Sequence, residues 1–328
     1  MSEKVQIVTT VSAWPEALEY QSKLLNKYCK EAFEFIAIVD TDPRPHFSNL
    51  WSKNARPKAI EIANRYCDAV IELPQDLHQN RSILFPETSK FDPRDPALRC
   101  AVSCQFAWKH LKKINSDRAI LIDSDMFPIR EFNFKSITKD KNVGAVHQVR
   151  KNESNQIEYF WNGIIAADFF SEPSLLDISF DAIIYNELKT DAGGGTYKWV
   201  SSNDKKINWL HHLSSLTWSK DQFPSYITPK LKDFIQSDDR NISDNYYSEI
   251  YTDTFFHFRA GGNWNAEPRN IVVNRRIKLF EAFCEMLGEE LNISMLEKQS
   301  FYSRLNELKH QAGVKLKNII RKSGLGPK

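Results

Sequence analysis

Two carboxylates in this chain are spaced for binding a cation. An apolar run from Arg118 ends at Asp123, and Asp125 follows after one residue. Residues two apart in a strand point to the same side, so both carboxylates can converge past the strand's carboxyl end, where open α/β sheets bind ligands. Adjacent carboxylates repel each other unless a cation lies between them. The pattern favours a Mg²⁺ or Mn²⁺ site with open positions for phosphate oxygens. A solvated turn is the alternative.

A second candidate segment lies where an aromatic strand reaches Asn162 and Gly163. Asparagine offers both a donor and an acceptor, and glycine lets a backbone approach a ligand closely. A third segment places Asp191 before three consecutive glycines, residues 193–195, whose bare N–H groups can face an anion. A turn and an inert loop are the alternative interpretations.

A fourth segment begins at His257, which comes out of a short aromatic strand. A neutral imidazole is a good third ligand for Mn²⁺. Arg259 and the amides of Gly261 and Gly262 follow closely and suit a diphosphate. A packed core histidine is the alternative.

The elements that must position these residues alternate between strand and helix over the first 125 residues, which predicts a parallel, doubly wound sheet. The apolar patterns predict strands at 5–11, 33–39, 69–73, 118–123, 143–149 and 159–167. They predict helices at 16–27, 58–66 and 97–113.

The chain changes character near residue 270. Helical patterns at 275–288 and 297–320 predict a helical appendix over 269–328, after a catalytic domain at 1–268. This appendix could pack on the core, form a homodimer contact or lie against a membrane. The last twenty residues hold six Lys or Arg and no Asp or Glu, which suits peripheral binding to anionic lipid. A solvated terminal helix is the alternative.

Composition excludes several classes. The net charge of +2 over 328 residues argues against broad nucleic-acid binding. We expect no signal peptide, and no apolar run is long enough to span a bilayer. Five cysteines, an odd number, indicate reduced thiols in a cytoplasmic protein. Cys100 and Cys104 are interpreted as small core residues.

Together these segments resemble the GT-A superfamily of nucleotide-sugar glycosyltransferases, with most likeness to the glycogenin and lipopolysaccharide galactosyltransferase type. The likeness covers roughly residues 4–268 and depends on three motifs. The matching positions are Asp123 and Asp125 in the first motif, Phe160, Asn162 and Gly163 in the second, and His257, Phe258, Gly261 and Trp264 in the third. The chain departs from the third motif, because Asn263 stands nearest to the family's phosphate-binding lysine and the following proline is missing.

The resemblance implies a GT-A fold, a Rossmann-like, doubly wound mixed sheet flanked by helices. It implies that Asp123, Asp125 and His257 hold Mn²⁺ or Mg²⁺, which stabilises the diphosphate leaving group. Arg259, Gly261 and Gly262 would supplement the metal.

The resemblance places the donor nucleotide over the first two strand ends. Its expected contacts are Thr9, Thr10, Asp40, Arg99 and Ser124. For Arg99 an ion pair is an equal alternative. Asp40 also begins a second Asp-x-Asp, which ranks behind the first as a metal site because prolines follow it.

The predicted activity is metal-dependent transfer of a sugar, hexosyl by analogy, from a nucleotide-diphosphate sugar to a glycan or lipid-linked acceptor in surface glycan assembly. Trp161, Asn162 and Asp191 are candidates for contacting the sugar or the acceptor, and Asp191 is the candidate general base if configuration inverts. Two rivals stay open. One is a haloacid-dehalogenase-like phosphatase, and the other is a non-catalytic nucleotide-sugar-binding module.

Overall fold

The structure is a computed structural model that describes residues 4–40, 55–85, 95–214, 223–241, 247–262 and 267–291. Several sequence predictions lie outside these residues. One is Asp42, the second carboxylate of the Asp-x-Asp that begins at Asp40. The others are Asn263 and Trp264 at the end of the third family motif, the helix at 297–320 and the basic tail.

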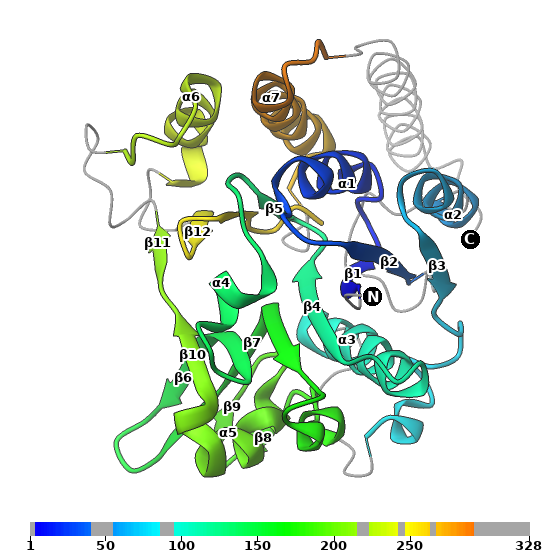
Figure 1. Ribbon diagram of the computed structural model, residues 1–328, viewed down its shortest axis with the longest axis vertical. Helices are drawn as coiled ribbons and strands as arrows, with labels where there is room; N and C mark the ends of the chain where they lie inside the picture. Colours follow the sequence, from blue (N-terminus) through cyan, green and yellow to red (C-terminus); the bar gives the residue numbers. More distant parts are fainter. Residues whose placement is uncertain are drawn as a thin grey trace, which may run out of the picture.

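The centre of the molecule is a seven-stranded mixed sheet (Figure 1). Its strand order is β10-β6-β7-β4-β1-β2-β3, with β7 antiparallel to both of its neighbours and the remaining pairs parallel. The strands are β1 (Val5–Val11), β2 (Phe33–Val39), β3 (Ala69–Glu72), β4 (Arg118–Asp123), β6 (Val143–Lys151), β7 (Gln156–Asp168) and β10 (Ile207–Leu210).

Helices cover both faces of this sheet, because its central strands are apolar on both sides. Figure 1 shows α1 (Ala17–Tyr28) and α2 (Ala55–Tyr66) on one face and α3 (Pro96–Lys113) on the other. Two separate apolar cores result, and Trp108 of α3 lies fully buried in one of them. An aromatic side chain buries roughly 150–250 Å², which at about 25 cal/mol per Å² corresponds to roughly 4–6 kcal/mol. The Asp95 side chain caps α3 by accepting a hydrogen bond from the Ala97 N–H at 3.0 Å.

A second, antiparallel sheet has the order β11-β12-β13-β5. Its strands are β11 (His212–Ser214), β12 (Ser248–Tyr251), β13 (Phe255–Phe258) and β5 (Met126–Pro128). Because β5 follows β4 directly, this sheet joins the main one beside Asp123. A small hairpin pairs β8 (Ile184–Tyr185) with β9 (Leu188–Lys189).

The helix α7 (Arg269–Leu287) packs into a third core with α1 and α6 (Pro229–Ser237). Trp14, Phe280 and Phe283 belong to this core, and Trp14 stacks on Phe280 at 5.6 Å. The helix ends at Gly288, whose φ of 72° favours glycine. It therefore shares a core with the domain that carries the candidate site.

The remaining elements are short. They are α4 (Phe134–Thr138), α5 (Tyr197–Asn203) and 3₁₀ turns at Arg81–Ile83, Pro173–Asp177, Gly194–Thr196, Asp204–Lys206 and Asp239–Asn241.

The predicted doubly wound mixed sheet with flanking helices is confirmed, and each predicted strand and helix that lies in the described residues is present. The helix predicted from residue 275 begins six residues earlier, at Arg269. The second sheet was not predicted. Among the helices that the structure describes, none is both long and apolar enough to cross a bilayer.

Candidate active site

A cavity of about 340 Å³ opens at the carboxyl ends of β1, β2 and β4. Parallel strands end together at this edge, and Thr10 pairs in register with Asp123. The lining residues come from every segment that the sequence singled out. They are Thr10, Val11, Ser12, Asp40, Asp95, Pro96, Ala97, Arg99, Cys100, Ser103, Asp123, Ser124, Asp125, Trp161, Asn162, Asp191, His257, Arg259, Ala260 and Gly262.

Asp123, Asp125 and His257 meet at one side of this cavity. Each offers a ligand atom, and the three atoms lie within 4.8 Å of one another. His257 reaches Asp125 because β13 pairs with β5, where His257 stands opposite Met126. The Asp125 carbonyl also accepts a hydrogen bond from the Phe258 N–H at 2.9 Å. The second sheet is therefore what brings the histidine to the carboxylates.

The pKa shifts of these groups show that the two carboxylates favour a positive charge beside them. Burial, followed by the adjacent charge of Asp125, raises the pKa of Asp123 to about 7. Burial lowers the pKa of His257, but Asp125 and Glu249 outweigh it and raise that pKa to about 10. Asp125 Oδ1 is buried and has no hydrogen-bond partner among the described residues, although His257 Nε2 lies 3.3 Å away. Two carboxylates, one of which has an unsatisfied oxygen, and an imidazole form a donor set for Mn²⁺ or Mg²⁺.

The loop after β13 fixes the second oxygen of Asp125. Gly261 N–H donates to Asp125 Oδ2 at 2.9 Å, and Arg276 of α7 donates to the Gly261 carbonyl. The Arg276 guanidinium lies 4.6 Å from the Trp14 ring. A Cβ on Gly261 would come within 2.8 Å of the Asp125 Cβ, so only glycine fits without a shift. Gly261 therefore supports Asp125 and does not itself line the cavity, in contrast to its predicted role.

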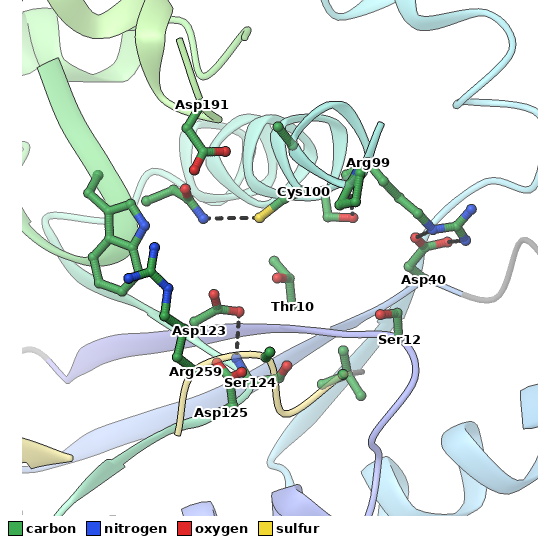
Figure 2. Close-up of a pocket in the computed structure, with 18 of the residues that line it drawn as sticks. Thr10, Ser12, Asp40, Arg99, Cys100, Asp123, Ser124, Asp125, Asp191 and Arg259 are labelled. Atoms are coloured by element: carbon green, nitrogen blue, oxygen red, sulfur yellow. Dashed lines mark hydrogen bonds and ion pairs between the residues drawn. The ribbon is translucent and has the colours of Figure 1, made fainter. Parts of the chain in front are cut away.

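Asp40 and Arg99 form a buried ion pair at the far end of the cavity (Figure 2). Arg99 Nε and one of its terminal nitrogens lie 2.9 Å from the two Asp40 oxygens, and His78 Nε2 lies 3.0 Å from Asp40 Oδ2. Asp40 is not part of the cluster of potential metal ligands in the described chain. Thr10 lines the cavity, but Thr9 points to the opposite side of β1 and is fully buried, which corrects its predicted placement.

Asp191, Asn162 and Cys100 lie across the cavity from Asp123 and Asp125, as Figure 2 shows for the residues that it labels. Asn162 Nδ2 donates to the Cys100 sulfur at 3.0 Å. Asp191 accepts a hydrogen bond from the Ala192 N–H at 2.8 Å, and burial raises the pKa of its carboxyl. Cys100 was predicted to be a core residue, but it lines the cavity because α3 begins at the cavity edge.

The glycine run at 193–195 is not an anion cradle. Its three N–H groups donate to backbone carbonyls of Phe180, Asp191 and Asp181. A Cβ on Gly193 would lie 2.2 Å from the Phe160 carbonyl, so this glycine permits packing against β7. A glycine run can bind an anion or can let the backbone pack closely, and the sequence pattern does not distinguish between the two.

Gly163 also has a different purpose from the predicted one. A Cβ there would lie 1.9 Å from the Trp161 ring. The missing side chain leaves room for this indole, which lines the cavity and lies 5.1 Å from the His257 ring. Gly163 therefore affects the shape of the cavity by making room for Trp161, and it does not line the cavity itself.

Comparison with known proteins gives structural similarities only. No protein-family profile matches this sequence, and no curated protein matches it. Among solved structures, the chain is similar to the WbbM bifunctional glycosyltransferase (TM-score 0.36, 10% identity), over 64% of this chain and 39% of that one. It is similar to mouse xyloside xylosyltransferase 1 (TM-score 0.36, 10% identity), over 63% of this chain and 85% of that one.

A third solved structure is that of the PaToxG glycosyltransferase (TM-score 0.35, 11% identity), with 90% of this chain and 83% of that one covered. The chain thus spans about two fifths of the length of WbbM. The described residues themselves have the α/β architecture that the resemblance to the GT-A superfamily implied.

Proposed function

We propose that this protein is a metal-dependent glycosyltransferase that moves a sugar from a nucleotide-diphosphate sugar to an acceptor hydroxyl. The supporting observation is the meeting of Asp123, Asp125 and His257 in a cavity at the carboxyl edge of a doubly wound sheet. Nucleotides bind at this edge in open α/β sheets. A cavity of about 340 Å³ also falls within the size range of small-molecule sites.

In this proposal Asp123, Asp125 and His257 hold Mn²⁺ or Mg²⁺. A bound divalent cation supplies Lewis-acid neutralisation of diphosphate oxygens. Arg259 lines the same cavity, and in this proposal its guanidinium contacts the diphosphate as well. Arg259 is therefore our candidate to bind the phosphate in place of the lysine of the third family motif, which this chain lacks.

The nucleoside would lie over Thr10, Ser12 and the paired Asp40 and Arg99, at one end of the cavity (Figure 2). The ion pair with Asp40 holds the Arg99 side chain in one orientation at this end of the cavity. The sugar would then lie between the carboxylate pair and Asn162.

Asp191 is the proposed group that contacts the sugar or the acceptor hydroxyl. Its carboxyl is buried, and burial raises its pKa towards the range in which a carboxylate is an effective proton acceptor. If the reaction inverts configuration, Asp191 would take the acceptor proton. The hexosyl donor and the glycan or lipid-linked acceptor are parts of the same proposal.

The test measures products from a panel of nucleotide sugars with Mn²⁺. We expect free nucleoside diphosphate from the wild type and none from Asp125→Ala. Asp140→Ala is the matched control, because Asp140 is a carboxylate whose side chain is 76% exposed and does not line the cavity. Release of inorganic phosphate would favour the phosphatase. Stabilisation by a nucleotide sugar without product would favour the binding module. Full activity of Asp125→Ala would refute the metal assignment.

A further inference from the structure

A buried acid that the sequence did not single out lies directly behind the proposed metal ligand His257. Glu249 stands opposite His257 in the pairing of β12 with β13. Its Oε2 lies 2.8 Å from His257 Nδ1, and both side chains are at most 5% exposed. Tyr251 OH donates to the same oxygen at 2.9 Å. Glu249 does not line the cavity, so it can act there only through another residue.

This contact decides which ring nitrogen faces the carboxylates. An ionised carboxylate only accepts hydrogen bonds, and Glu249 Oε2 already accepts one from Tyr251. His257 Nδ1 must therefore carry a proton and donate it. The other nitrogen, Nε2, points to Asp125 Oδ1 at 3.3 Å. A neutral ring with a protonated Nδ1 has its lone pair on Nε2, on the side of the proposed metal site.

The strand register makes this arrangement specific. The hairpin between β12 and β13 turns at Thr252 and Asp253, whose φ angles are 52° and 55°. A slip of one residue would point Glu249 to the opposite face of the sheet. The second oxygen of Glu249 lies 3.8 Å from Arg259 Nη1. One buried acid thus contacts both the proposed metal ligand and the proposed diphosphate ligand.

We propose that Glu249 is a positioning residue that fixes the tautomer and orientation of His257 for metal binding. The inference rests on the metal site of the proposed function. It adds a residue from a different strand, outside the cavity, to the set that determines metal affinity. Outer carboxylates of this kind typically change metal affinity by about 10–100-fold when they are replaced.

The test is direct Mn²⁺ binding to metal-stripped protein, measured by the electron paramagnetic resonance signal of free Mn²⁺. Glu249→Gln keeps the shape of the side chain and removes its charge, and we expect its Kd to rise by about 10–100-fold. Tyr251→Phe is the matched control. It removes a hydrogen bond to the same oxygen but leaves the contact with His257, so we expect a smaller rise.

A second measurement uses the wild type, so it does not depend on a variant that folds. The ¹⁵N chemical shifts of the His257 ring with bound Mg²⁺ should show a protonated Nδ1 and an unprotonated Nε2. A proton on Nε2 would overturn the proposal. So would a folded Glu249→Gln protein, checked by circular dichroism, whose Mn²⁺ affinity equals that of the wild type. Wild-type protein without Mn²⁺ affinity would overturn the metal site itself together with this inference.

Discussion

Asp123→Asn should stabilise the metal-free protein while it removes metal binding. The substitution keeps an oxygen to accept the Ser124 N–H, which lies 2.9 Å from Asp123 Oδ1. It removes one of two charges that repel each other. Burial and the charge of Asp125 raise the pKa of Asp123 from 3.8 to about 7. Since each pKa unit corresponds to about 1.4 kcal/mol, the ionised carboxylate costs the metal-free fold about 4 kcal/mol well above pH 7.

The sign of the pH dependence follows from the raised pKa. Well below pH 4 the carboxyl is protonated in both the folded and the unfolded chain, so it does not affect stability. As the pH rises from about 4 to about 7, the unfolded chain ionises first and the fold loses stability. The Asp123→Asn protein has no ionisable carboxyl at this position, so its stability does not fall in this way as the pH rises. Its advantage over the wild type should be about 1.7 kcal/mol at pH 5 and approach about 4 kcal/mol at pH 8.

Urea unfolding of both metal-stripped proteins between pH 5 and pH 8 measures this difference. Asp140→Asn, at a 76% exposed carboxylate, is the control and should stay within about 0.5 kcal/mol of the wild type. Added Mn²⁺ at about 100 times its Kd should stabilise the wild type by about 2.7 kcal/mol. It should leave Asp123→Asn unchanged. Equal stabilities at pH 8 without metal, or an equal response to Mn²⁺, would refute the reasoning.

Three further outcomes are expected. Gly163→Ala should destabilise the fold by about 1–3 kcal/mol in urea unfolding, because its Cβ would lie 1.9 Å from the Trp161 ring; a neutral result would show that the indole moves freely. Arg276→Met should weaken Mn²⁺ binding, measured by calorimetry, because the carbonyl of Gly261 loses its donor; unchanged affinity would make the arginine a packing residue only. If Asp191 is the general base, kcat/KM should fall with decreasing pH at a midpoint above the ordinary range for aspartate, since burial raises the pKa of Asp191. A pH profile with an ordinary aspartate midpoint would contradict this.

The strands and the carboxylate pair could be predicted because both are local patterns. Asp123 follows an apolar run, and the side to which it points depends on two-residue periodicity alone. The placement of His257 required long-range pairing between β13 and β5. The residue type made His257 a candidate ligand, but only the resemblance to a family indicated that it joins the carboxylates, because no local rule specifies which strands pair across more than a hundred residues.

Glu249 and Arg276 escaped the sequence analysis for the same reason. Glu249 is the single acid in the four-residue strand β12, and its importance lies in facing His257 across a hairpin. Arg276 is one of several basic residues in a helix, and only the packing of α7 shows that it is buried. The glycines at 163 and 193 were misread because glycine that admits a ligand and glycine that admits a neighbouring side chain look alike in sequence.

The route from Arg276 through Gly261 to Asp125 has a consequence for biosynthesis. A chain emerging from the ribosome would complete β4 long before α7 is available to dock. The carboxylates would exist early, but the arginine that anchors their supporting loop would arrive about 150 residues later. The proposed cation site would therefore be completed only after α7 has been synthesised and has packed against the rest of the chain.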